Sequence, residues 1–316
     1  MTQPYLDAAR AVLRWGNRKP NRTGIDTISA FGVNLSHDLR DGFPLLTTKK
    51  IDWFHIVAEN LWFLSGDPKI AMLRRHGIKF WDAWADDAGR VPSAYGNFWR
   101  RFRGLYEILD HGPDACQIEL KSIDQMRYAI DTLKANQWTR RAVITAWDPA
   151  NAHLSKLPPC HVMMVFNVQN LDGVPHLCLH LTQRSADMFL GVPYNTAGYA
   201  LILTLMSKWV GLPPGIFSHT LVDAHIYTRP EDWTEGDPVA SGGTHETDAN
   251  ELLDHLPLMR RQIEREPRMM PVLDITEDFG LDDVPALLQR TKSELLEIFR
   301  LRFYDPHPAI RGAVAV

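Results

Sequence analysis

Three short strings in the middle of the chain hold residue types that could act together on an anionic substrate. They read LPPCH at 157–161, QRSAD at 183–187 and GVPYN at 191–195. The cysteine could attack a carbon atom, the arginine could hold a phosphate, and the asparagine could read the lactam edge of a base. The set favours an enzyme that acts on an anionic, amide-bearing small molecule.

Cys160 is the candidate nucleophile, with a buried structural thiol as the alternative. Two prolines fix the backbone before it, and the polar His161 follows it. In a strand these neighbouring side chains would point to opposite faces, which disfavours a Cys–His hydrolase dyad. A nearby arginine could instead lower the pKa of the thiol.

Arg22, Arg184 and the pair Arg140-Arg141 are candidate phosphate ligands. Taken singly, each arginine is read as a solvated surface charge. Several of them, with Ser185 in reach, would make a forked phosphate site. The sequence alone leaves open whether they converge.

Polar groups in two apolar segments are further candidates. Glu59 lies in the aromatic run 51–64, which predicts a mostly buried helix, so its charge is paired, functional or turned to the helix surface. His225 and Tyr227 share one face of a predicted strand with Asp223. They suit a sugar hydroxyl better than a metal ion, because no second cluster with ligand spacing accompanies them. A solvent-facing strand is the alternative.

Helices and strands are interspersed without strict alternation, which predicts one α+β domain over residues 1–316. A helix is predicted from Leu6 to Leu13 with a stop at Gly16, and further helices at 51–64, 122–133 and 195–210, the last capped by a Pro-Tyr-Asn turn. Strands are predicted at 27–35, 141–147, 161–168, 176–183 and 216–227. The polar residues 229–249, with several Gly and Pro, are expected to form an exposed loop or insertion.

Composition disfavours several other classes of protein. The 316 residues carry a net charge of −4, so no basic field recruits DNA or another polyanion. Three cysteines without CxxC spacing argue against a disulfide framework and a zinc site. The N-terminus lacks a signal pattern, and no apolar run reaches the ~18 residues that span a bilayer. A cytoplasmic protein without a membrane segment is therefore expected.

Colinear motifs along nearly the whole chain closely resemble the thymidylate synthase family. In chain order they are NRTG (21–24), FPLLTTKK (43–50), LWFL (61–64), WD (81–82), YG (95–96), RR (140–141), PPCH (158–161), QRS (183–185), DAHIY (223–227), YDPHPAI (304–310) and AVAV (313–316). Each string alone is a weak signal, whereas their common order makes the assignment strong. The resemblance implies a homodimer of α+β subunits, with a twisted mixed β-sheet backed by helices and one sheet face at the dimer interface.

The same resemblance implies a reaction. Deoxyuridylate (dUMP) would be methylated reductively, with 5,10-methylenetetrahydrofolate as the co-substrate that gives both carbon and hydride, and without a metal. Cys160 would add to carbon 6 of the uracil and make carbon 5 nucleophilic. Glu59, through water, would manage protons at the base, with Tyr95 assisting proton removal from carbon 5.

Binding roles carried over from the family cover the two substrates. The phosphate would be held by Arg22, Arg184 and Ser185, together with Arg140 and Arg141 of the partner subunit. The uracil would bond to Asn195 with Asp187 nearby, and the 3′-hydroxyl of the deoxyribose to His225 and Tyr227. The folate site would be lined, under a closing C-terminal lid, by Trp81, Trp84, Leu157, Asp187, Gly191, Tyr194, Ala315 and Val316.

The chain departs from the family pattern at a few positions. Residues 92–94 read PSA where Gly-Pro-Val is usual, and Phe98 stands where a glutamine is common. His180 and Thr182 replace a glutamine and a tyrosine on the strand that leads to the QRS string. Asp52 occupies a position that often contacts folate through a different side chain. These departures could alter the folate side or the lid.

Three other functions stay open. A deoxyuridylate hydroxymethylase on the same scaffold would let water capture the exocyclic methylene, although Trp81, Leu157 and Val316 favour a closed, dry site. A nucleotide- or RNA-binding regulator without turnover would need no thiol. A cysteine hydrolase is disfavoured by the adjacency of Cys160 and His161.

Overall fold

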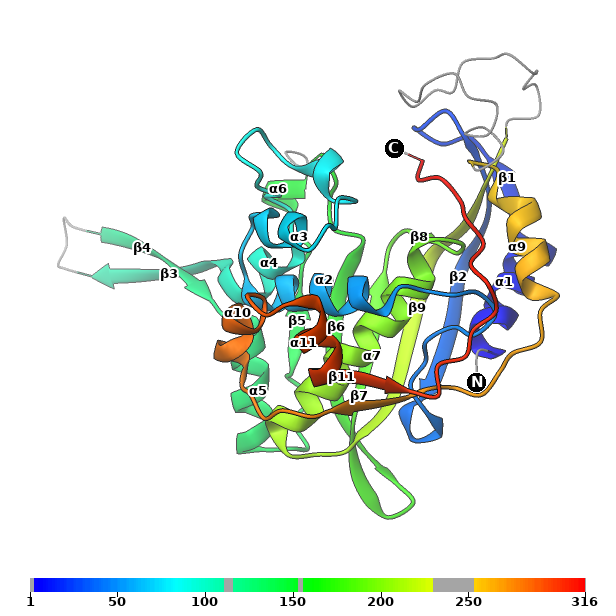
Figure 1. Cartoon of the computed structure of the whole chain (residues 1–316). Helices are drawn as coiled ribbons and strands as arrows, with labels where there is room; N and C mark the ends of the chain where they lie inside the picture. Colours follow the sequence, from blue (N-terminus) through cyan, green and yellow to red (C-terminus); the bar gives the residue numbers. More distant parts are fainter. Residues whose placement is uncertain (1–2, 111–115, 153–155, 230–252, 316) are drawn as a thin grey trace.

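The computed structural model describes residues 3–110, 116–152, 156–229 and 253–315. Within them a seven-stranded mixed sheet has the order β1-β2-β9-β7-β6-β5, with β8 paired to β9 (Figure 1). These strands are Asn17–Lys19 (β1), Asp26–Asp38 (β2), Val143–Thr145 (β5), His161–Leu171 (β6), Val174–Gln183 (β7), Ala186–Asp187 (β8) and Pro214–Thr228 (β9). β9 runs parallel to β7 and β8, and the other neighbours pair antiparallel. The predicted α+β fold with a mixed sheet is confirmed.

Helices pack on this sheet at two places. α7 (Gly191–Val210) contacts β7 and β9 and also α2 (Trp53–Ser65). α1 (Gln3–Trp15) and α9 (His255–Ile263) pack against β2 and β9 (Figure 1). In the part of the chain that the structure describes, each helix is too short or too polar to cross a bilayer.

The remaining elements are short. The helices are α3 (Ala71–Arg75), α4 (Tyr95–Arg101), α5 (Gln125–Ala135), α6 (Pro149–Ala152), α10 (Val284–Leu287) and α11 (Lys292–Ile298), with 3-10 turns at Leu39–Asp41, Asp82–Trp84 and Leu281–Asp283. Two further antiparallel pairs are β3 (Phe102–Asp110) with β4 (Cys116–Ile123) and β10 (Val272–Ile275) with β11 (Phe299–Arg302). The β3–β4 pair projects from the body of the molecule (Figure 1).

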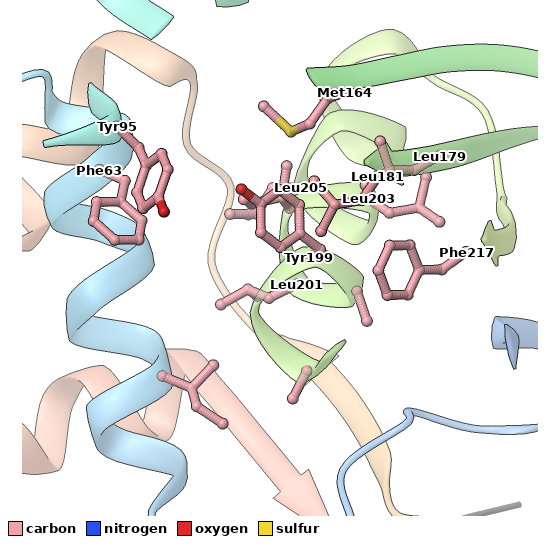
Figure 2. Close-up of a cluster of buried hydrophobic side chains, with 14 of the residues drawn as sticks. Phe63, Tyr95, Met164, Leu179, Leu181, Tyr199, Leu201, Leu203, Leu205 and Phe217 are labelled. Atoms are coloured by element: carbon pink, nitrogen blue, oxygen red, sulfur yellow. The ribbon is translucent and has the colours of Figure 1, made fainter. Parts of the chain in front are cut away.

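The long helix α7 forms the centre of the core. Most of its residues are buried on all sides, which explains why its sequence is apolar without a polar face. Leu203 and Leu205 of α7, Phe217 of β9 and Leu181 of β7 belong to the same buried cluster (Figure 2). This packing holds the helix rigidly behind the sheet strands that end at the cavity described below.

Two glycines allow close approach of the helices that carry candidate catalytic groups. A Cβ on Gly198 of α7 would lie 2.7 Å from Nδ2 of Asn60 on α2. A Cβ on Gly96 of α4 would lie 2.1 Å from the carbonyl oxygen of Phe63 on α2. Glycine is required at the Gly96 crossing, where the obstacle is backbone, whereas at Gly198 the Asn60 side chain would have to shift, so α2 lies close to both α4 and α7 at the site.

Most predicted helices are present, and their starts lie at capping residues. The buried helix α2 starts at Trp53 because the carboxylate of Asp52 accepts from the backbone N–H of Phe54 at 3.0 Å. The helix predicted at 122–133 starts later, after its N-cap Asp124, because the residues before it belong to β4. Asp52, noted as a departure on the folate side, thus has a structural role.

The prediction that Asn195 caps a helix is wrong. α7 already begins at Gly191, and Asn195 lies within it. The backbone N–H groups of Phe189 and Leu190 donate to Oδ1 of Asp187 at 2.9 and 3.1 Å. This carboxylate, rather than Asn195, therefore organises the entry into the helix.

Strand predictions hold at the centre of the sheet and shift at its edges. Each strand predicted at 27–35, 161–168, 176–183 and 216–227 is present and longer. The strand predicted at 141–147 contracts to β5, and the β3–β4 and β10–β11 pairs were not predicted. Apart from residue 229, the predicted loop 229–249 lies outside the described residues.

Candidate active site

A cavity of about 820 Å³ lies where β7, β8 and β9 meet the ends of α2, α4 and α7. Most of the site residues predicted from the sequence line it. They are Arg22, Glu59, Trp81, Trp84, Tyr95, Leu157, Cys160, Arg184, Ser185, Asp187, Gly191, Asn195, His225, Tyr227 and Ala315. Residues far apart in the sequence therefore converge on one cavity, as the arginine hypothesis requires for Arg22 and Arg184.

The thiol of Cys160 sits at a corner held by two long side chains. Oη of Tyr95 accepts from the backbone N–H groups of Cys160 and His161 at 3.0 and 3.3 Å. Arg184 donates through Nε to the Pro159 carbonyl at 2.9 Å and through Nη2 to the Pro158 carbonyl at 2.8 Å. Arg184 was predicted as a phosphate ligand, and the structure adds that it braces the backbone of the nucleophile.

Burial and charge act on the Cys160 thiol in opposite directions. Burial raises the pKa of Cys160 by more than the guanidinium groups of Arg184 and Arg22 lower it, so the net shift is upward. The side chain is nevertheless partly exposed, and that exposure is to the cavity. The purely structural interpretation of this thiol is therefore disfavoured.

Tyr95 is packed among aromatic rings at the start of α4. Its ring stacks on His161 with centroids 4.5 Å apart and meets Phe63 edge-on at 5.0 Å. Figure 2 shows the Phe63 and Tyr95 rings side by side. Burial, followed by the nearby Cys160 and Glu59, raises the pKa of Tyr95 well above its usual value, so the phenol stays neutral. Since its oxygen accepts two N–H groups, its own proton remains available for donation.

Glu59 faces the cavity from the middle of α2. Its Oε1 accepts a hydrogen bond from Nε1 of Trp81 at 2.7 Å. Burial raises the pKa of Glu59 to about 7, and the bond from Trp81 opposes this shift. A carboxyl with such a pKa can both give and take a proton near neutral pH, which the helix-surface alternative does not explain.

The two β9 residues predicted to bind a sugar also face the cavity. The rings of His225 and Tyr227 lie edge to face at 5.1 Å, and Nδ1 of His225 lies 3.1 Å from the Asp223 carbonyl oxygen. Burial raises the pKa of Tyr227 to about 12. Asp223 accepts from Lys19 at 2.7 Å and from Ser29 at 2.5 Å. Among the residues that the structure describes, no three potential metal ligands gather in one place.

Among the described residues, three predicted ones are not brought to this cavity. Arg140 and Arg141 line a separate hollow of about 520 Å³ with Tyr128 and Trp138. Tyr194 lies on α7 but not on the cavity wall, and Val316 is outside the described residues. In a single chain the arginine pair therefore does not reach the other phosphate candidates.

Several wall residues were missed by reasoning from the sequence. They include Lys19, Asn21, Lys156 and Gln183, whereas His161 and Asp223 were noted in the sequence without a binding role. Asn21 and Gln183 belong to motif strings, so the strings themselves were the available signal. The positions of Lys19 and Lys156 carried no comparable signal, because each is an ordinary lysine in a polar segment.

This geometry defines a class of protein. An α+β fold presents a thiol, a carboxyl of raised pKa and two arginines to one cavity, as in enzymes that activate an anionic substrate covalently. A model of the family described as thymidylate synthase matches residues 3–316. The thymidylate synthase of Haloferax volcanii is 40% identical to this chain, over 99% of the chain and 96% of that protein. The chain belongs to the thymidylate synthase family, and it is an enzyme of the methyltransferase class.

Proposed function

We propose that the enzyme converts dUMP to thymidylate, with 5,10-methylenetetrahydrofolate as the donor of carbon and hydride. One observation carries this proposal. A thiol, a near-neutral carboxyl and the amide of Asn195 open onto a single cavity that also contains Arg22 and Arg184. The thiol matches carbon 6 of the uracil, and the carboxyl matches the proton transfers. The amide matches the lactam edge, and the two arginines match the phosphate of dUMP.

Cys160 begins the reaction by adding its sulfur to carbon 6 of the uracil. The bond pair of the 5,6 double bond moves to carbon 5, which becomes able to attack a carbon electrophile. Arg184 and Arg22 favour the thiolate, and the brace from Arg184 to the two proline carbonyls keeps the corner rigid. The folate supplies the methylene carbon and then the hydride.

Glu59 and Tyr95 handle the protons. A carboxyl with a pKa of about 7 can protonate the uracil carbonyl as the thiol adds and take the proton back later, through a water molecule. The neutral phenol of Tyr95 already accepts two backbone N–H groups, so its oxygen cannot also accept the carbon 5 proton. Tyr95 instead assists removal of that proton by donating a hydrogen bond to a water molecule.

The phosphate site is completed by a second copy of the chain. Arg22, Arg184 and Ser185 hold one side of the phosphate, and Arg140 and Arg141 of the partner subunit hold the other. The separate hollow that contains this arginine pair supports the arrangement. Phe31 on β2 is a large apolar side chain that is 88% exposed, and a second chain packed on this sheet would cover it.

The rest of the cavity suits the sugar and the folate. His225 and Tyr227 bind the 3′-hydroxyl, and Asp187 positions Asn195 and the folate. Trp81, Trp84, Leu157, Gly191 and Ala315 form an apolar wall for the pterin, while Tyr194 and Val316 join them when the C-terminal segment closes. The family match over 3–316 supports one catalytic unit, and a reduced nucleophile supports a cytoplasmic location.

Product analysis tests the proposal against its nearest rival. Incubation with dUMP and 5,10-methylenetetrahydrofolate should yield thymidylate and dihydrofolate, the latter as a rise in absorbance. Cys160→Ala serves as the inactive control. Formation of 5-hydroxymethyldeoxyuridylate with tetrahydrofolate, and no dihydrofolate, would identify a hydroxymethylase instead.

A further inference from the structure

A line of hydrogen bonds runs from the cavity into the core behind it. Oδ1 of Asn195, on the cavity wall, accepts from Nε2 of Gln183 at 3.1 Å. Oε1 of Gln183 lies 2.9 Å from Nε2 of His219 on β9. Gln183 is 3% exposed and His219 is fully buried. The mechanism above gives no role to His219.

A backbone carbonyl fixes which group donates and which accepts in each of these hydrogen bonds. Nε2 of Gln183 also donates to the Ser185 carbonyl oxygen at 2.9 Å, and a carbonyl oxygen can only accept. The amide nitrogen of Gln183 therefore faces Ser185 and Asn195, and its oxygen faces His219. His219 must then carry its hydrogen on Nε2.

The surroundings of His219 agree with this tautomer. Burial lowers the pKa of His219 well below its usual value, with His161, His37 and His180 acting in the same direction, so the ring is neutral. Among the described residues, Nδ1 of His219 has no hydrogen-bond partner. A buried acceptor without a partner is better tolerated than a buried N–H without one, which favours the hydrogen on Nε2.

On the basis of the proposed function, we propose that His219 is a positioning residue that selects uracil over cytosine through Gln183 and Asn195. Uracil presents an N–H and a carbonyl to the reader, and cytosine presents the reverse pair. Turning the Asn195 amide over would match cytosine, but it would place two amide nitrogens against each other at Gln183. Turning Gln183 in response would set its oxygen against the Ser185 carbonyl and its nitrogen against the N–H of His219.

Nucleotide binding without folate tests this inference separately from the reaction. The ratio of the dissociation constants for dCMP and dUMP is measured by calorimetry. His219→Phe keeps a ring of similar size without the donor and should lower the ratio by about tenfold, as expected when a buried acceptor loses its partner. His219→Gln restores an N–H donor and should keep the wild-type ratio.

His37→Phe is the matched control. His37 is also a buried histidine, its ring lies near Phe217 as that of His219 does, and no hydrogen bond joins it to Gln183 within the described residues. In His37→Phe the ratio of the dissociation constants for dCMP and dUMP should stay at the wild-type value, since general loosening of the core weakens the binding of both nucleotides alike. An unchanged ratio in His219→Phe, or an equal fall in His37→Phe, overturns the inference.

A measurement on the wild-type protein does not depend on any variant folding. Nitrogen-15 NMR of labelled histidine should show the neutral Nε2–H tautomer for His219, and an Nδ1–H tautomer overturns the inference. If the protein prefers dUMP by this line of contacts but forms no thymidylate, the proposed function fails and the positioning role stands.

Discussion

The corner around Cys160 (the thiol corner) and the hollow lined by Arg140 and Arg141 (the arginine hollow) differ in how far one chain completes them. At the corner, Tyr95 and Arg184 satisfy the backbone around Cys160 with hydrogen bonds from the same chain. In the hollow, Arg140 and Arg141 lie beside Trp138, which is 53% exposed. Under the proposed dimer, one chain prepares the covalent step alone, and a second chain completes the anion site. Separating the chains should therefore lower activity more than it disturbs the geometry around Cys160.

The largest expected effect is at the thiol corner. Cys160→Ala should lower kcat by about 10⁴-fold or more, because no other group can form the bond to carbon 6. Binding of dUMP, measured by calorimetry, should persist because the phosphate and base contacts remain. With wild type, 5-fluorodeoxyuridylate and the folate should add mass to the peptide that contains Cys160. A label on Cys178 instead would contradict this assignment.

The arginine hollow is tested by mixing inactive chains. Arg140→Ala should lower kcat/KM for dUMP by roughly 10- to 100-fold, as a charge-assisted bond is lost. Reassociation with Cys160→Ala chains should recover up to about a quarter of wild-type activity, because half the dimers then hold one intact site.

Arg184→Ala mixed with Cys160→Ala is the matched control for this experiment. Both residues act at the same corner of one chain, so no hybrid site becomes intact and no recovery is expected. Native mass spectrometry verifies that heterodimers form. Equal recovery in both mixtures, or none in either, would argue against arginines shared between chains.

The last prediction concerns the pH-dependent stability that the buried Glu59 carboxyl contributes. Because the pKa of Glu59 is raised from 4.5 to about 7, the folded protein holds this proton more tightly than the unfolded chain. That contribution is complete below pH 4.5 and is lost as the pH rises to about 7. Relative to wild type, Glu59→Gln should gain up to about 3 kcal/mol in unfolding free energy between pH 4.5 and pH 8.

Urea denaturation at both pH values measures this gain. Glu297→Gln, at an exposed position on α11, is the control and should differ from wild type by a constant amount. If Glu59→Gln also shows a constant difference, the carboxyl does not hold its proton more tightly in the folded state.

The residues that sequence reasoning placed well are those whose neighbours constrain them strongly. Glu59 was singled out because a charge in an aromatic helix needs an explanation, and Cys160 because two prolines fix its backbone. The carboxyl does face the cavity, and the corner does hold the thiol. Local chemistry was enough at both positions.

Other features depend on contacts that no local pattern contains. The brace from Arg184 to the Pro158 and Pro159 carbonyls joins two strings, and only the folded sheet brings them together. The start of α7 was misplaced because the Asp187 carboxylate caps the turn before it, and Asn195 resembles a cap in sequence. Under the proposed dimer, Arg140 approaches the site from a second chain, and periodicity cannot reveal such a contact.

The pairing of β2 with β9 also has a consequence for the order of folding. Asp26 pairs with Thr228, so two adjacent strands of the central sheet come from segments about two hundred residues apart in the chain. During synthesis β2 emerges early and has only the short β1 beside it until β9 is made. Its free edge is then open to wrong partners, and this sheet must close late and slowly. Dependence on chaperones during synthesis, rather than marginal final stability, is the expected weakness of this fold.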